Sequence, residues 1–112
     1  MTECIFCKIA KKEIPSDLIY EDERVVVFKD IKPKASVHFL IVPKKHIVSI
    51  DHLEPQDKDL VGDLIFTAKK LAKEKNLDGY KIHINVGKNG GQLIEHLHLH
   101  LLSGKLENIT NI

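Results

Sequence analysis

The sequence predicts an α+β domain with a largely antiparallel sheet, and three observations support this prediction. Short runs rich in Val, Ile and Leu are separated by hairpin-length turns, as in consecutive antiparallel strands. One longer segment carries apolar residues at helical spacing. In residues 96–102, three histidines alternate with leucines, which is typical of a strand with one buried face. The 112 residues suffice for a single domain, residues 1–112, with one modest core.

The first half of the chain predicts one short helix and three strands, over residues 4–12, 18–20, 24–29 and 38–42. The helix is predicted because Ile5, Phe6 and Ile9 have helical spacing. The first two strands form a hairpin around residues 21–23. The third strand ends at Pro43, which cannot donate a hydrogen bond within a sheet.

The second half predicts a long helix, a fourth strand and the histidine strand. Pro55 suits the first position of the helix, and Gly79 lies near its end. The apolar face of this helix consists of Leu60, Val61, Leu64, Ile65, Ala68, Leu71 and Ala72. The strands are expected over residues 80–86 and 95–102, with a tight loop at 87–91 between them. Residues 103–112 carry little pattern, and we expect a mobile C-terminal tail there.

Composition excludes several classes of function. The formal net charge is +1, so we expect no attraction to nucleic acid or to an anionic membrane surface. No apolar run approaches the length of a membrane span, and the N-terminus lacks the pattern of a signal peptide. A cytoplasmic location is therefore expected. In a reducing compartment, the two close cysteines, Cys4 and Cys7, indicate metal or redox chemistry rather than a structural disulfide.

The alternation predicts that His96, His98 and His100 form one row and that the leucines between them face a core. Such a row suits nucleophilic or acid–base chemistry, and it equally suits a three-histidine metal site. The neighbouring loop favours phosphate chemistry. Its two adjacent glycines allow the backbone to approach a ligand closely, while Asn85 and Gln92 supply neutral hydrogen-bond donors.

Residues 96–102 match completely the signature His-φ-His-φ-His-φ-φ, in which φ is apolar, and the chain thus resembles the histidine triad (HIT) superfamily. Further segments look like the Hint branch of that family in order and spacing, at residues 4–9, 28–31, 38–46 and 90–92. The resemblance covers nearly the whole chain. It implies a HIT-like fold, with a five-stranded antiparallel meander sheet, one long helix and one short helix. It also implies a homodimer whose sheets join.

The resemblance implies a nucleotidyl hydrolase or transferase that acts on the α-phosphate of purine nucleotides. His98 would be the nucleophile and would form a nucleotidyl-histidine that water then hydrolyses. The expected substrate is of the adenosine 5′-monophosphoramidate type. One alternative is a dinucleoside polyphosphate hydrolase of the Fhit branch. Others are a nucleotide-binding protein with weak or vestigial activity, and a metalloenzyme whose zinc is held by the triad itself.

The resemblance also implies the roles of individual residues. The expected catalytic residues are His98, His100, His96 and Asn85. The expected phosphate contacts are Asn85, Gln92, His100 and the amides after Gly91, and Asp30 is placed against the ribose. His38 would support the triad. The apolar slot for the base is matched by Ile5, Phe6, Ile9, Phe28, Ile31 and Leu40, although residues at these spacings are also typical of a core.

One position departs from the family pattern. The Hint branch usually has Ser after the Gly-Gly-Gln segment, and this chain has Leu93. Leu93 stays among the expected nucleotide-binding positions but lacks the hydroxyl that would contact phosphate or the leaving group. We therefore expect a slower enzyme with the same type of reaction.

The C-x-x-C at Cys4 and Cys7 is ambiguous by itself. A redox motif would want a thioredoxin-like βαβ context, which the pattern does not predict. The resemblance implies a structural zinc site completed by His46 and His96, closed because all four positions are filled. No organic cofactor is expected. His52 and His83 match no family role, and we expect them to be surface or packing residues.

Overall fold

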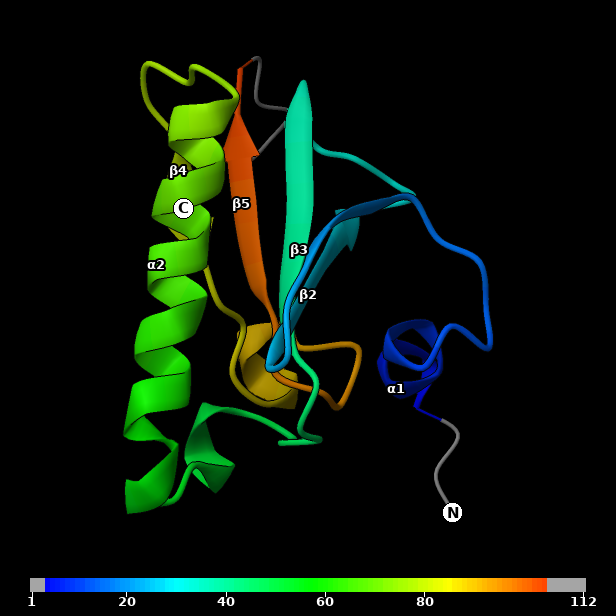
Figure 1. Ribbon diagram of the computed structural model, residues 1–112. Coiled ribbons are helices and arrows are strands. Elements are labelled where there is room, and N and C mark those ends of the chain that lie inside the picture. Colours follow the sequence, from blue (N-terminus) through cyan, green and yellow to red (C-terminus); the bar gives the residue numbers. More distant parts are fainter. Residues whose placement is uncertain (1–3, 105–112) are drawn as a thin grey trace.

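A five-stranded antiparallel sheet forms the centre of the structure, a computed structural model that describes residues 4–104 (Figure 1). The helices are α1 (Ile5–Ala10) and α2 (Lys58–Glu74), and 3₁₀ turns occupy Ile50–His52, Pro55–Asp57 and Lys88–Gly90. The strands are β1 (Leu18–Glu21), β2 (Val25–Lys29), β3 (Val37–Pro43), β4 (Lys81–His83) and β5 (Leu99–Ser103). The predicted antiparallel α+β fold with one long and one short helix is thus confirmed.

The order of the strands is β1-β2-β3-β5-β4. The first three form the predicted meander, whereas β4 lies at the edge and β5 lies between β4 and β3. The connection from β3 to β4 runs through α2. Strand β5 pairs with β3 on one side and β4 on the other, which places His100 in the interior of the sheet.

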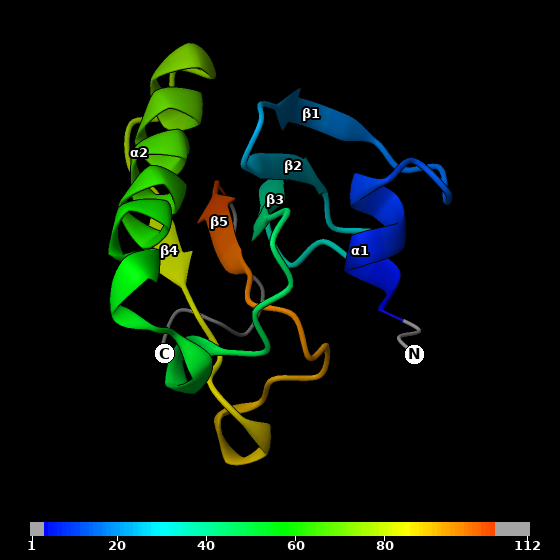
Figure 2. The same cartoon turned by 60° about the horizontal axis from the view of Figure 1, so that its bottom comes forward.

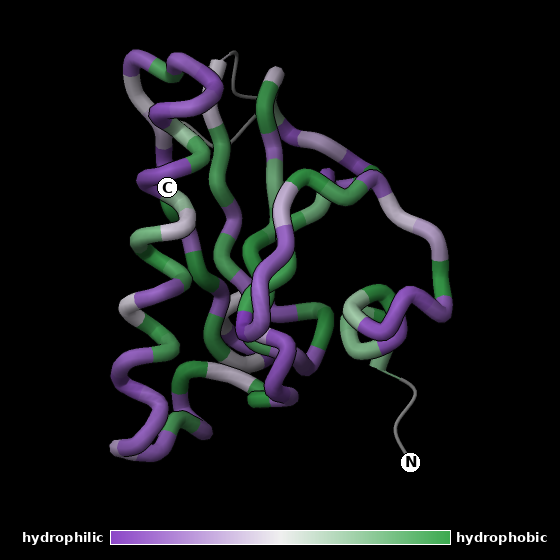
Figure 3. The backbone as a smooth tube through the Cα atoms, viewed as in Figure 1, coloured by the Kyte–Doolittle hydropathy of each residue, from purple (hydrophilic) through white to green (hydrophobic). Residues whose placement is uncertain are grey.

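The two faces of the sheet carry separate cores. On one face α2 covers side chains such as Val27, Ile41 and Leu99, and on the other α1 covers Phe28 and Leu40 (Figure 2). Helix α2 alternates hydrophobic and hydrophilic positions along its length (Figure 3), which is the pattern of a helix with one buried side. Ile65 belongs to the predicted apolar face of α2, but its side chain is 41% exposed. It lies beyond the stripe of residues that contacts the sheet.

Three predicted elements are shorter in the structure. Helix α1 begins after Cys4, which caps it, and its helical hydrogen bonding ends at Lys11. Strand β4 spans only Lys81–His83, because its one partner, β5, begins at Leu99 and no ladder exists beyond the pair His83–His100. Before Leu99 the chain leaves the sheet, and the amide of Leu97 donates to the carbonyl of Ile47 instead, at 2.7 Å.

The predicted mobile tail begins at Ser103, but this residue belongs to β5 and its hydroxyl donates to the carbonyl of Gly79 at 2.6 Å. Residues 105–112 of that prediction lie outside the described residues. Within residues 4–104, the helices lack the combination of length and apolar character that crossing a membrane requires.

Candidate active site and metal cluster

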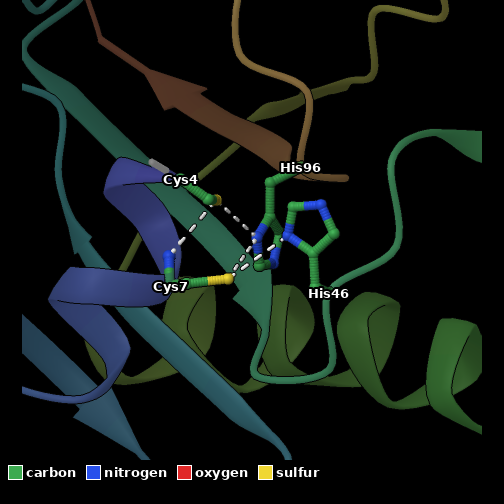
Figure 4. Close-up of side chains that lie close together, drawn as sticks. All are labelled: Cys4, Cys7, His46 and His96. Carbon is green, nitrogen blue, oxygen red and sulfur yellow. Dashed lines mark hydrogen bonds between the residues drawn. The ribbon is translucent and has the colours of Figure 1, made fainter. Parts of the chain in front are cut away.

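Two cysteines and two histidines, the four residues predicted as zinc ligands, come together beside α1 (Figure 4). Sγ of Cys4 lies 3.2 Å from Nδ1 of His96, and Sγ of Cys7 lies 3.2 Å from Nδ1 of His46. All four ligand atoms lie within 4.8 Å of one another. In a tetrahedral zinc site, with bonds of about 2.0–2.3 Å, neighbouring ligands lie about 3.5 Å apart. The cluster therefore has the dimensions of such a site.

Local structure orients three of these four side chains. Cys4 is the N-cap of α1, and its Sγ accepts a hydrogen bond from the amide of Cys7 at 3.4 Å, which brings the two sulfurs to one side of the first turn. Nε2 of His96 donates to the carbonyl of Pro43 at 2.8 Å, so the lone pair of Nδ1 faces the sulfurs. Burial lowers the pKa of His96 to about 4, which keeps its ring neutral and able to bind a metal.

The donor set fits a borderline-soft cation. Two thiols and two imidazoles are the ligands of structural zinc, and four protein ligands leave no position for water. Burial raises the pKa of the Cys7 thiol, and the hydrogen bond with Cys4 and the repulsion between the two sulfurs raise it further. Residues of this chain that would hold a metal are thus Cys4, Cys7, His46 and His96.

The ring of His98 is fixed by its own neighbour. Its Nδ1 lies 2.7 Å from the carbonyl oxygen of His96, which can only accept, so Nδ1 carries the hydrogen and Nε2 keeps its lone pair. Phe6 of α1 packs edge-on against this ring at 5.1 Å between centroids. His98 is buried, and burial lowers its pKa, so the ring is in the neutral form that a nucleophile requires.

The tautomer of His100 follows from a chain of hydrogen bonds. The amide of Lys34 donates to Nδ1 of His38 at 3.0 Å, so the hydrogen of His38 is on Nε2. That Nε2 donates to Nδ1 of His100 at 2.9 Å, which leaves the hydrogen of His100 on its Nε2. The ring of His100 lies 5.0 Å from that of His98. An N–H donor and an imidazole lone pair thus lie side by side.

Burial, reinforced by the neighbouring imidazoles, lowers the pKa of His100 to about 3. At neutral pH the ring therefore donates a hydrogen bond as a neutral group and does not act as a strong acid. The predicted row of three histidines holds for His98 and His100, whereas the ring of His96 is turned to the cysteines. Both His96 and His98 precede β5, and the His96 ring is held by the carbonyl of Pro43 on one side and by Sγ of Cys4 on the other.

Asp30 lies next to this chain of histidines. Its Oδ2 is 3.3 Å from Nε2 of His38, its Oδ1 accepts from the amide of Lys32 at 2.8 Å, and its side chain is 20% exposed. A partly exposed carboxylate has further lone pairs with which to accept a hydrogen bond from a hydroxyl group.

Two residues of the β4 segment join the site, and sequence reasoning missed one of them. His83 pairs with His100 across the β4–β5 ladder, with 5.0 Å between the ring centroids. Its Nε2 lies 3.0 Å from Oδ1 of Asn85, whose Nδ2 donates to the carbonyl of Gly90 at 2.7 Å. The prediction that His83 is a surface or packing residue is therefore incomplete. The signal was present, because residues two apart in a strand share a face.

The glycine loop, residues 87–92, is held by hydrogen bonds between its own backbone groups. The amides of Gly90, Gly91 and Gln92 donate to carbonyls within the loop, at 3.0–3.1 Å. Both amide hydrogens of the Gln92 side chain are also used, by the carbonyls of Val48 and Ile94, at 2.7 and 2.9 Å. Gln92 thus braces the loop here, and a phosphate contact from it or from these amides would require one of these bonds to open.

The residues expected around the base divide into two groups. Four are buried in the core between α1 and the sheet: Phe6, Ile9, Phe28 and Leu40. Ile31 and Leu93 are 91% and 92% exposed, and Ile5 is 42% exposed. The buried group acts as core in this structure, whereas the exposed side chains are the ones that a ligand could reach without a rearrangement of the core.

Comparisons with known proteins identify relatives of this chain and structures with the same fold. The family model described as scavenger mRNA decapping enzyme C-term binding matches residues 3–111. Protein HitA of Neisseria gonorrhoeae is 48% identical over 103 residues, covering 91% of this chain and 96% of HitA. A HIT family hydrolase from Legionella pneumophila Philadelphia 1 is similar in structure, with a TM-score of 0.91, 43% identity and coverage of 96% of this chain and 98% of that one. A Zn-bound histidine triad family protein from Mycobacterium smegmatis has a TM-score of 0.80 and 32% identity, over 96% of this chain and 78% of that one.

Proposed function

The chain belongs to the histidine triad family, and from that premise we propose that it is a nucleotidyl hydrolase acting on the α-phosphate of purine nucleotides. The substrate class that we propose is a purine nucleoside 5′-phosphoramidate, of the adenosine 5′-monophosphoramidate type. The observation that carries the proposal is the bond from Nδ1 of His98 to the carbonyl of His96, because it leaves the lone pair of Nε2 available. The similarity to the HIT family hydrolase from Legionella pneumophila supports the proposal that the reaction is a hydrolysis.

In the first step, Nε2 of His98 forms a bond to phosphorus and the bond from phosphorus to the leaving amine breaks. The leaving nitrogen takes up one proton. In the second step, water attacks phosphorus, the bond to Nε2 breaks, and the water releases one proton. The products are the nucleoside monophosphate and the amine. Division into two steps lowers each barrier relative to a single displacement.

Charge on the phosphate oxygens grows in each transition state, and fixed donors stabilise it. The N–H of His100 is the best-prepared donor, because its tautomer is set by His38 and its ring adjoins His98. Asn85 has a second Nδ2 hydrogen beyond the one given to Gly90. A single preorganised donor of this kind contributes about 10²–10³-fold to the rate.

We also propose that the four-residue cluster holds structural zinc. Its donor set and dimensions support this, as does the relative from Mycobacterium smegmatis that is Zn-bound. When bound, zinc would crosslink α1 to the segment that carries His96. It would take no part in the phosphoryl chemistry. The homodimer, the cytoplasmic location and the absence of an organic cofactor stay predictions.

The test is a search for the covalent adduct. Wild-type protein is mixed with adenosine 5′-monophosphoramidate, denatured rapidly at alkaline pH, where a phosphorus–nitrogen bond to histidine survives, and measured as intact protein by mass spectrometry. We expect an adenylyl adduct that peptide mapping places on His98 and that is lost in His98→Ala. The control is His52→Ala, which alters a histidine in the 3₁₀ turn Ile50–His52.

Turnover by His98→Ala, or tight binding of nucleotide without adduct or turnover, would contradict the proposal. Diadenosine polyphosphate is assayed in parallel, and faster cleavage of it than of the phosphoramidate would contradict the substrate class while leaving the adduct chemistry intact.

A further inference from the structure

His83 lies against the histidines of the site, and the proposed reaction gives it no role. It is on the edge strand β4, directly opposite His100 on β5, and the two rings are tilted by 58° with 5.0 Å between centroids. Since β5 lies between β3 and β4, this edge position brings His83 to the face of the sheet that carries Leu40 and His100.

The hydrogen bonds around Asn85 have a defined direction. Oδ1 of an amide can only accept, so Nε2 of His83 carries a hydrogen and donates it at 3.0 Å. The other end of the amide, Nδ2, donates to the carbonyl of Gly90 at 2.7 Å. A contact at each end holds the carboxamide in one orientation, and flipping it would set donor against donor and oxygen against oxygen.

The glycine loop confines the same amide from another side. Gly91 has a φ of +86°, and a Cβ at this position would lie 3.2 Å from Nδ2 of Asn85. The carboxamide therefore lies between the imidazole of His83 and a loop backbone that leaves no room for a side chain. Its second Nδ2 hydrogen is the one that remains for a substrate.

We propose that His83 is a positioning residue, whose Nε2–H fixes the Asn85 carboxamide so that the remaining Nδ2 hydrogen points to the phosphate of the nucleotide. This inference rests on the proposed function. An amide that could rotate would spend part of its time with its oxygen toward the phosphate, where it repels negative charge. Orientation before the reaction removes that cost from the transition state.

Two substitutions separate the hydrogen bond from the packing. His83→Phe keeps a flat ring against His100 but cannot donate, whereas His83→Gln keeps an N–H donor and loses the ring. We expect His83→Phe to lower kcat about tenfold. This is less than the about 10²–10³-fold in rate that complete loss of one donor costs, because Asn85 itself remains. KM should change less than kcat, and His83→Gln should restore kcat to within about threefold of wild type. His52→Phe, in the 3₁₀ turn Ile50–His52, is the control.

A double-mutant cycle with Asn85→Ala tests the pathway of the effect. If His83 acts through Asn85, His83→Phe has no further effect in the Asn85→Ala protein. Multiplied losses in the double variant, a wild-type kcat for His83→Phe, or equal losses for His83→Phe and His83→Gln would each overturn the inference.

A readout without turnover keeps the inference separate from the proposed function. In ¹⁵N-labelled protein, the Nδ2 proton resonances of Asn85 should shift in His83→Phe and return toward wild-type positions in His83→Gln. Unchanged resonances in His83→Phe would overturn the inference. Failure of the wild type to form the His98 adduct would overturn the proposed reaction, and with it the assigned purpose of this orientation, while the resonances would still report whether His83 fixes the amide.

Discussion

The carbonyl oxygen of His96 lies 2.7 Å from Nδ1 of His98, while the ring of His96 lies against the sulfurs of Cys4 and Cys7. One residue therefore belongs to the proposed zinc cluster and also orients the proposed nucleophile. Phe6 of α1 adds a second connection, since it packs on the rings of both histidines. Interactions that hold α1 and His96 in place therefore also help to orient the ring of His98.

Loss of a cysteine should therefore remove zinc and disturb the orientation of the His98 ring. We expect Cys7→Ser to lose its zinc, measured by elemental analysis, and to unfold at a lower temperature. A ligand present at about 100–1,000 times its dissociation constant stabilises a fold by about 3–4 kcal/mol. We expect the loss of zinc to lower the free energy of unfolding by an amount of this size. Formation of the His98 adduct should slow without stopping. Full zinc content in Cys7→Ser, with His52→Ala as the control, would contradict the assignment of the cluster.

The tautomer of His100 depends on His38, so His38→Phe should disturb it. Without the donor from His38, the hydrogen of His100 is free to occupy either ring nitrogen, and the N–H aimed at the phosphate is present only part of the time. We expect kcat to fall by about tenfold, as a fraction of one donor's contribution. The ¹⁵N shifts of the His100 ring report the tautomer directly. An unchanged tautomer in His38→Phe would show that another group sets it.

Acid should destabilise the fold through His100. Its pKa is about 3 in the folded protein against an ordinary value of 6.5, so below pH 6.5 the unfolded chain binds a proton that the folded chain does not. The free energy of unfolding therefore falls as the pH falls from 6.5 toward 3, and the contribution is fully present above pH 6.5. At pH 5 this residue accounts for at most about 2 kcal/mol of the loss.

Denaturant unfolding of wild type and His100→Gln at pH 7 and at pH 5, at equal zinc content, checks this. The difference between the two pH values should be smaller for the variant. An equal difference in the two proteins would mean that other groups carry the pH dependence.

Leu93 stands where the Hint branch usually has Ser, and it is 92% exposed. Because it packs against little, Leu93→Ser should change the free energy of unfolding by no more than about 0.5 kcal/mol. We expect kcat for the phosphoramidate to rise several-fold, because a hydroxyl is returned beside the phosphate or the leaving group. Phe66→Ser on α2, also an exposed apolar position, is the matched control. A slower Leu93→Ser enzyme would indicate that the leucine itself binds the leaving group.

Local patterns in the sequence determined the elements and much of their pairing. The alternation around Leu99 and His100 predicted a strand with two chemically different faces, and the apolar spacing of residues 60–72 predicted the long helix. The C-x-x-C and the distant His46 and His96 were connected by family resemblance rather than by local physics, and the structure brings the four together.

Only the tertiary structure decided which hydrogen-bonding groups remain for a substrate. Gln92 was a sound candidate as a donor, yet both of its amide hydrogens are used within the fold. His83 matched no motif, and it meets His100 because β5 returns between β3 and β4. Residue type and local spacing set the conformation of a segment, since those forces act over a few residues. The partner of each imidazole and amide depends on which distant strand lies beside it, and that is settled only when the sheet assembles.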